Sequence, residues 1–181
     1  VGVCGVGRLA VVASAGPHFG EEAPLVGRRG SGTVFFSGCS LSCVFCQNAD
    51  ISHQPGAGTL VDAPELALLF ERMQSLGCHN LNLVSPSHVL PQVLAALDQA
   101  AGRGLRIPLV WNCGGYETLE ALALLDGVVD IYMPDLKVME AAAGERYLGA
   151  PDYPEVARAA LAEMHRQVGD LAVDGMGVAS R

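Results

Sequence analysis

The chain has 181 residues, of which half are hydrophobic, and a formal net charge of -8 at pH 7. This length and composition predict a folded protein with one sizeable core. Its acidic character, without a cluster of Lys and Arg, argues against an electrostatic nucleic-acid partner. No apolar run is long enough to span a bilayer and the start lacks a secretory signal, which predicts a cytoplasmic protein that has no membrane partner.

The first expected strand covers residues 9–13. Residues 16–20, Gly-Pro-His-Phe-Gly, are expected to break it before a solvated turn that contains Glu21 and Glu22. β-Branched and aromatic residues predict a strand at 33–36. Asp62 and Glu65 match a capping pattern for a helix that ends at Gly77. Further patterns predict strands at 80–84, 108–112 and 128–133, helices at 89–102, 119–127, 141–147 and 154–168, and a turn at 174–177.

A strand followed by a helix, repeated four times, is typical of βαβ crossovers and a parallel sheet. The fold class predicted is α/β, a partial TIM-type (β/α) barrel with about four parallel strands flanked by helices and with open edges. Residues 1–31 are interpreted as an N-terminal segment and residues 32–181 as the core domain. Because the chain begins with Val1 and no strand follows the last turn, we expect a piece of a longer protein.

Polar residues follow each of the four parallel strands. In such folds, ligands bind at the carboxyl ends of the strands. Taken singly, these residues have ordinary explanations, such as a Ser-Pro turn or a solvated ion pair, but their shared placement favours a ligand site. The candidates are Cys39, Cys43 and Cys46 after the first strand, Ser85 and Ser87 after the second, Asn112 at the end of the third, and Asp135 and Lys137 after the fourth.

Cys39, Cys43 and Cys46 lie within eight residues, a spacing that favours metal binding over a disulfide framework. Such a loop can wrap three thiolates around three irons of a cubane cluster and leave the fourth iron open. The competing hypothesis is structural zinc, with His53 as a fourth ligand. The remaining cysteines, Cys4, Cys78 and Cys113, are interpreted as buried or inert thiols.

Cys39-x3-Cys43-x2-Cys46, with Phe45 before the last cysteine, resembles the signature of radical SAM enzymes. More narrowly, the chain is similar to the pyruvate formate-lyase activating enzyme-like proteins, in a branch whose substrate is unassigned. The stretches that carry this resemblance are 32–39, 46–48, 82–88, 112–116 and 130–137. Family members continue through two further strand-helix units into an incomplete (β/α)₆ barrel, and a cysteine-containing segment precedes this region, of which Cys4 is interpreted as a remnant.

The resemblance implies that Cys39, Cys43 and Cys46 ligate a [4Fe-4S] cluster whose open iron binds S-adenosylmethionine. Phe45 would lie against the adenine. An electron from a reductant such as flavodoxin or ferredoxin would cleave S-adenosylmethionine to methionine and a 5′-deoxyadenosyl radical. Activation of a glycyl-radical enzyme, which would be a protein substrate, is one candidate role by analogy.

The chain departs from the family pattern after the second parallel strand, where Ser85-Pro86-Ser87 replaces Gly-Gly-Glu. The hydroxyl of Ser85 or Ser87 is therefore the candidate partner of the S-adenosylmethionine amino group. Asp135 and Lys137 match an Asp-x-Lys element whose lysine pairs with the carboxylate of S-adenosylmethionine. Asn112 stands where relatives carry polar groups that face the ligand. The alternatives are a zinc-stabilised binding module and an inactive fragment that keeps the cluster loop.

Overall fold

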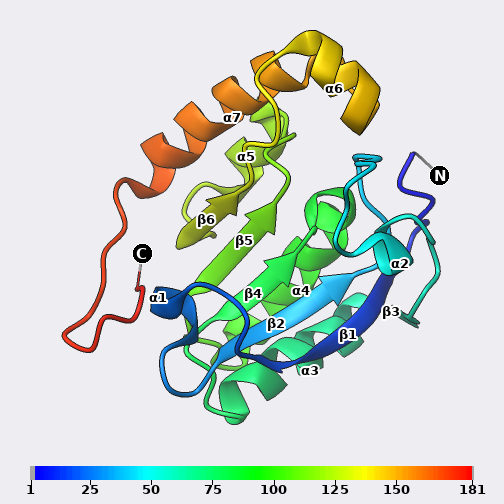
Figure 1. Cartoon of the computed structure of the whole chain (residues 1–181). Coiled ribbons are helices and arrows are strands. Elements are labelled where there is room, and N and C mark those ends of the chain that lie inside the picture. The colour runs from blue at the N-terminus through cyan, green and yellow to red at the C-terminus, as the bar shows by residue number, and fades with distance from the viewer. Residues whose placement is uncertain (1–2, 181) are drawn as a thin grey trace.

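The computed structural model describes residues 3–180, which form a six-stranded sheet in the order β3-β1-β2-β4-β5-β6 (Figure 1). The last four strands in this order are parallel to one another. They are β2 (Ser31–Phe36), β4 (Leu81–Val84), β5 (Leu109–Cys113) and β6 (Ile131–Pro134). The predicted parallel α/β architecture is thus confirmed. A mostly parallel sheet flanked by helices is compatible with part of a barrel.

Two antiparallel strands, β1 (Ala10–His18) and β3 (Thr59–Val61), extend the sheet beyond β2. The predicted open edge at β2 is therefore wrong, because β1 pairs with it. The strand predicted at 9–13 is longer in the structure, since β1 continues through Gly16 and Pro17 and ends at His18, within the predicted break at 16–20. Only β2 pairs with this half of β1, because β3 reaches no further than Val12. Proline is tolerated at such an edge because one side of the strand needs no ladder hydrogen bond.

The outer face of the sheet is covered by helices whose predicted bounds agree closely with the structure. They are α3 (Ala63–Ser75), α4 (Leu90–Gly102), α5 (Leu119–Leu125) and α7 (Tyr153–Val168). Asp62 and Glu65 form the predicted reciprocal capping box at the start of α3. Between helices and sheet, Phe70, Leu83 and Trp111 are fully buried or nearly so, which places the main core on this face.

The inner face of the sheet is covered by other short segments. Leu25 of α1 (Ala23–Val26) packs with Val110, Ile131 and Ala179. The C-terminal segment returns from α7 to α1, where the N–H of Ala179 donates to the carbonyl of Pro24 (Figure 1). The remaining short helices, α2 (Ala49–Ser52), a 3-10 turn at Ser87–Val89 and α6 (Ala141–Leu148), lie toward the carboxyl ends of the strands. None of the helices in residues 3–180 is long and apolar enough to cross a membrane.

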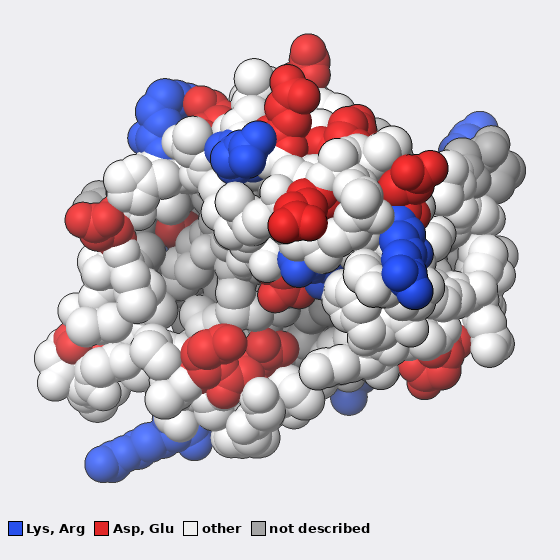
Figure 2. All heavy atoms as spheres, turned by 45° about the horizontal axis from the view of Figure 1, so that its top comes forward, with Lys and Arg blue, Asp and Glu red and all other residues white. Residues whose placement is uncertain are grey.

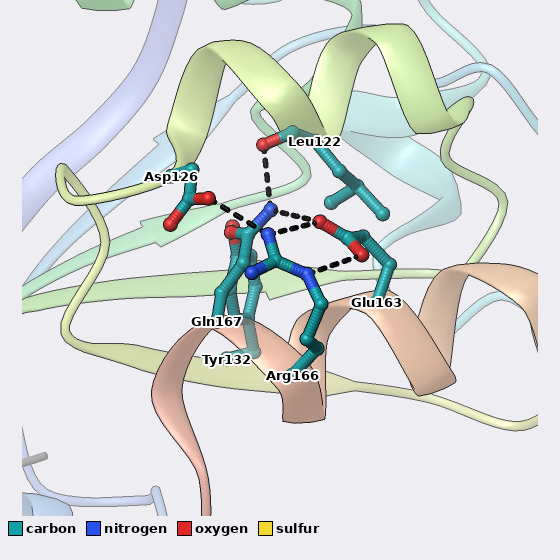
Figure 3. Close-up of polar contacts among 6 residues, drawn as sticks. All are labelled: Leu122, Asp126, Tyr132, Glu163, Arg166 and Gln167. Carbon is teal, nitrogen blue, oxygen red and sulfur yellow. Dashed lines mark hydrogen bonds and ion pairs between the residues drawn. The ribbon is translucent and has the colours of Figure 1, made fainter.

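Polar contacts fix α7 against α5 and β6 (Figure 3). Gln167 receives a hydrogen bond from the Tyr132 hydroxyl at 2.6 Å and donates to the carbonyl of Leu122 at 2.9 Å. Arg166 bridges Glu163 and Asp126, but exposed ion pairs of this kind add little stability. Because the C-terminal half of α7 is anchored in this way, its first residue, Tyr153, is held at the carboxyl edge of the sheet.

The Gly32→Ala variant should be destabilised by about 1–3 kcal/mol, a cost typical of overpacking. A Cβ at Gly32 would lie 2.7 Å from the Cβ of Met73 and 2.8 Å from the carbonyl oxygen of Asn80. Gly16→Ala is the matched control, since Gly16 lies in the neighbouring strand with no atom within 4 Å of the added carbon. Urea unfolding measures both variants, and equal stabilities would contradict the close approach of α3 to β2.

Candidate functional site

The cysteine loop, residues 38–46, begins beside a fully buried serine. The hydroxyl of Ser37 lies 3.1 Å from the carbonyl oxygens of both Ile51 and Gln54, and it accepts the N–H of Gly56. Its carbonyl lies 2.9 Å from Nε2 of His88, which follows β4. Ser37 therefore connects the start of the cysteine loop both to residues 51–56, which follow that loop, and to the loop after β4.

The other side of the cysteine loop is bound to the end of α6. The N–H of Ser42 donates to the carbonyl of Leu148 at 3.2 Å, and that of Val44 donates to the carbonyl of Tyr147 at 3.0 Å. Cys43 is buried in the same place, in a cluster with Leu148. The loop is thus held on two sides, which restricts the positions its three sulfurs can take.

The three thiols differ in exposure and in hydrogen bonding. Cys43 is buried, whereas Cys39 and Cys46 are half-buried. Cys39 Sγ accepts the N–H of Leu41 at 3.4 Å, and Cys46 Sγ lies 3.1 Å from the hydroxyl oxygen of Ser52. Burial raises the pKa of both Cys39 and Cys43, and the nearby positive charge of Lys137 partly opposes this shift. Among residues 3–180, no three His, Cys, Asp or Glu side chains are arranged to hold one metal ion.

Both predicted serines lie beside Cys39. Cys39, Ser85, Ser87 and Gly114 line one small cavity at the carboxyl edge of the sheet. Ser85 has a φ of 53°, the one positive value among the non-glycine residues that the structure describes, and its N–H donates to the carbonyl of Asn112 at 2.8 Å. Such backbone strain is typical of functional sites and persists only where surrounding contacts enforce it.

Lys137 and Asp135 form an ion pair at 2.8 Å, in which the lysine side chain is 19% exposed and the aspartate 67%. Burial tends to lower the pKa of Lys137, but the hydrogen bond and charge of Asp135 raise it, and the net shift is upward. The lysine therefore stays charged. Its side chain also approaches Gly114, at the edge of the cavity that Cys39 lines.

Tyr153 is a central residue of this edge that the sequence pattern did not assign. Its hydroxyl lies 2.8 Å from the carbonyl of Gly114 and 2.7 Å from that of Asp135, and it accepts the N–H of Lys137 at 2.9 Å. A buried tyrosine needs such partners. Little in the sequence indicates this role, because Tyr153 directly precedes a proline at the start of a helix, where it resembles an ordinary residue of the capping region.

The remaining predicted residues lie at the edges of this site. Phe45 is 51% exposed on the cysteine loop. Asn112 is half-buried on the strand position that pairs with Val84 and Met133. His53 lines a separate cavity of about 460 Å³, together with Cys4 and Cys39.

Two of the cysteines predicted to be inert, Cys78 and Cys113, are free and buried. Cys4, the third, is free and half-buried. The predicted burial is therefore confirmed for Cys78 and Cys113, whereas Cys4 is buried only in part.

Figure 2 shows the face onto which the strands' carboxyl ends open. Acidic side chains are scattered over it and outnumber the basic ones, in keeping with the chain's net charge of -8. A recess near the middle of the view is bordered by atoms of both signs. Such a mixed border can bind a ligand that itself carries both charges.

Comparison with known proteins gives two partial matches. An uncharacterized protein of Methanocaldococcus jannaschii is 35% identical over 145 residues, which cover 77% of this chain and 41% of that protein. The 7-carboxy-7-deazaguanine synthase of Methanothermobacter thermautotrophicus is 36% identical over 69 residues, 38% of this chain and 27% of that enzyme. No family model matches the chain. The chain therefore spans less than half the length of either relative.

The Tyr153→Phe variant should lose about 1–3 kcal/mol of stability, because two carbonyls and one N–H lose their shared hydroxyl partner. Tyr116→Phe is the matched control: Tyr116 stacks on Tyr153, with ring centroids 5.9 Å apart, but its hydroxyl bonds to Asp152 at an exposed position. Chemical denaturation compares the two variants. Equal losses would show that the Tyr153 hydroxyl does not hold these loops together.

Proposed function

We propose that this chain carries the cluster-binding part of a radical SAM enzyme. The observation that carries the proposal is the three-cysteine loop, held at the carboxyl edge of four parallel strands. The partial match to 7-carboxy-7-deazaguanine synthase supports the superfamily at this coarse level. The finer resemblance to pyruvate formate-lyase activating enzymes rests on the sequence motifs.

The donor set of the loop suits a [4Fe-4S] cluster. Thiolates are the usual ligands of such clusters, and N–H groups directed at sulfur tune them. Cys39 Sγ already accepts an N–H, and the charge of Lys137 favours the thiolate forms of Cys39 and Cys43. A cubane binds each thiolate to a different iron, so its ligands need not converge on a single ion as those of zinc must.

When bound, the cluster and S-adenosylmethionine supply the electron transfer that yields methionine and a 5′-deoxyadenosyl radical. The tasks of the chain are to bind and orient. Lys137 would pair with the carboxylate of S-adenosylmethionine, a charge-assisted contact strengthened by its partial burial. Ser85 and Ser87, beside Cys39, would receive the amino group. Phe45 would pack against the adenine from the exposed side of the loop.

Because the chain spans 41% and 27% of the lengths of its two relatives, its substrate and electron donor are proposals. A reductant such as flavodoxin or ferredoxin, and a glycyl-radical enzyme as protein substrate, are proposed by family resemblance. The competing hypothesis is a zinc-stabilised binding module. It draws on one observation, that His53 and Cys39 line the same cavity of about 460 Å³.

Anaerobic reconstitution should give a brown protein with iron and sulfide that releases 5′-deoxyadenosine when dithionite and S-adenosylmethionine are added. Cys43→Ala should lose iron and sulfide, because one thiolate ligand is removed. Cys78→Ala is the matched control, since Cys78 is also a buried free thiol but lies in the main hydrophobic core. Full iron content in Cys43→Ala would exclude the assigned ligands, and a colourless protein with one zinc would favour the binding module.

Lys137 is the sole lysine in the sequence, so amine-reactive labelling reports on it almost alone. S-adenosylmethionine should protect Lys137 from labelling in the reconstituted protein. Lys137→Ala should weaken its binding roughly 10-fold or more while iron content is retained, as the loss of a charged hydrogen bond predicts. Arg146→Ala is the control, because Arg146 is an exposed cation on the nearby α6. If S-adenosylmethionine does not change the labelling of Lys137 and Lys137→Ala keeps the wild-type affinity, Lys137 does not bind this ligand.

A further inference from the structure

The loop after β4 offers hydroxyls but no carboxylate for a cationic amino group. The structure brings a carboxylate there from elsewhere: Glu117, between β5 and α5, accepts a hydrogen bond from the hydroxyl of Ser87. We propose that Glu117 is a positioning residue that recruits the amino group of S-adenosylmethionine through Ser87. This inference rests on the proposed radical SAM function, and it assigns a residue that the sequence motifs did not single out.

The direction of the Ser87 hydrogen bond sets what Ser87 can offer to a ligand. A hydroxyl has one hydrogen to donate and two lone pairs, and an ionised carboxylate can only accept. Since the hydrogen of Ser87 is directed to Glu117, the remaining lone pairs of its oxygen are available to the cavity that Cys39 also lines. An ammonium group is purely a donor, so it is the matching partner for an oxygen that is fixed as an acceptor.

Glu117 also lacks a compensating cation. It is 5% exposed, and among residues 3–180 no Lys or Arg forms an ion pair with it. Glu117 accepts hydrogen bonds from the Ser87 hydroxyl and the Cys113 thiol, and burial raises the pKa of that thiol far enough to keep it protonated. Burying an unpaired charge is costly. A ligand that carries positive charge beside Ser87 would offset that cost.

Burial also raises the pKa of Glu117, although the two hydrogen bonds oppose this shift. The approach of a cation would lower the pKa again, because a nearby positive charge favours the ionised carboxylate. Ligand binding and ionisation of Glu117 thus favour each other. A carboxylate with a purely structural role would not distinguish a cationic ligand from an uncharged analogue of the same shape.

The test compares Glu117→Gln with the wild type, both reconstituted without oxygen. Equilibrium dialysis measures the binding of S-adenosylmethionine and of its deamino analogue, which keeps the sulfonium and carboxylate but lacks the ammonium. Glu117→Gln should bind S-adenosylmethionine about 10-fold more weakly, because the negative charge that strengthens the contact between the Ser87 oxygen and the ammonium group is lost. Its affinity for the deamino analogue should change by less than about 2-fold, because the lost interaction involves only the ammonium group.

Three further variants separate positioning from folding. Glu120→Gln is the matched control, an exposed glutamate on the next helix that should change neither affinity. Ser87→Ala should reproduce the loss, while Ser87→Thr, which keeps the hydroxyl, should largely restore binding. Because Glu117 acts through Ser87, the Ser87→Ala/Glu117→Gln double variant should lose no more than either single variant.

Each outcome decides between the two proposals. Wild-type protein that assembles no cluster, or that binds no S-adenosylmethionine, overturns the proposed function and this inference with it. Wild-type binding with an unchanged Glu117→Gln, or equal losses for both ligands, overturns only the role of Glu117. If circular dichroism shows that Glu117→Gln is unfolded, Ser87→Ala takes its place, and an unchanged affinity in that variant overturns the inference.

Discussion

Parallel pairing of β2, β4, β5 and β6 is the constraint on which the rest of the structure depends. In a parallel sheet every strand carries its carboxyl end to the same edge, so the four following loops meet there whatever their sequences. The register aligns Phe35, Val84, Asn112 and Met133 across the sheet. The cysteine loop, the serine turn and the Asp135-Lys137 pair therefore emerge side by side, although almost a hundred residues separate the first from the last.

Buried polar groups then fix these loops in place. The hydroxyls of Ser37 and Tyr153 each contact three backbone groups from other loops, and Ser85 keeps a positive φ where its N–H reaches the carbonyl of Asn112. An unpaired buried hydroxyl would cost free energy, so each of these contacts favours one loop arrangement over others. This rigidity matters for a site that must hold a cofactor and a ligand in fixed geometry.

This edge of the sheet carries both a cation and a carboxylate. Lys137 lies by the loop after β6, and Glu117 reaches Ser87 beside the cavity of Cys39. The amino-acid part of S-adenosylmethionine carries a carboxylate and an ammonium group, so one residue suits each end of it. The proposals on Lys137 and Glu117 are therefore complementary halves of one binding mode. The substrate is a separate question, because the chain spans 41% and 27% of the lengths of its two relatives.

The sequence by itself determined the main architecture: hydrophobic periodicity, the Asp62-Glu65 cap and the alternation of strands and helices predicted the four parallel strands and the helices α3 to α7, but not the short elements α1, α2 and β3. It also singled out the cysteine loop, because close spacing of thiols is a local signal. It missed the continuation of β1 from Ser14 through Pro17 to His18, since whether a proline is tolerated depends on which neighbouring strand pairs there. Only the tertiary structure brought Tyr153 to Lys137 and Glu117 to Ser87, because the 16 and 30 residues that separate these pairs are closed by packing, not by any pattern in the chain.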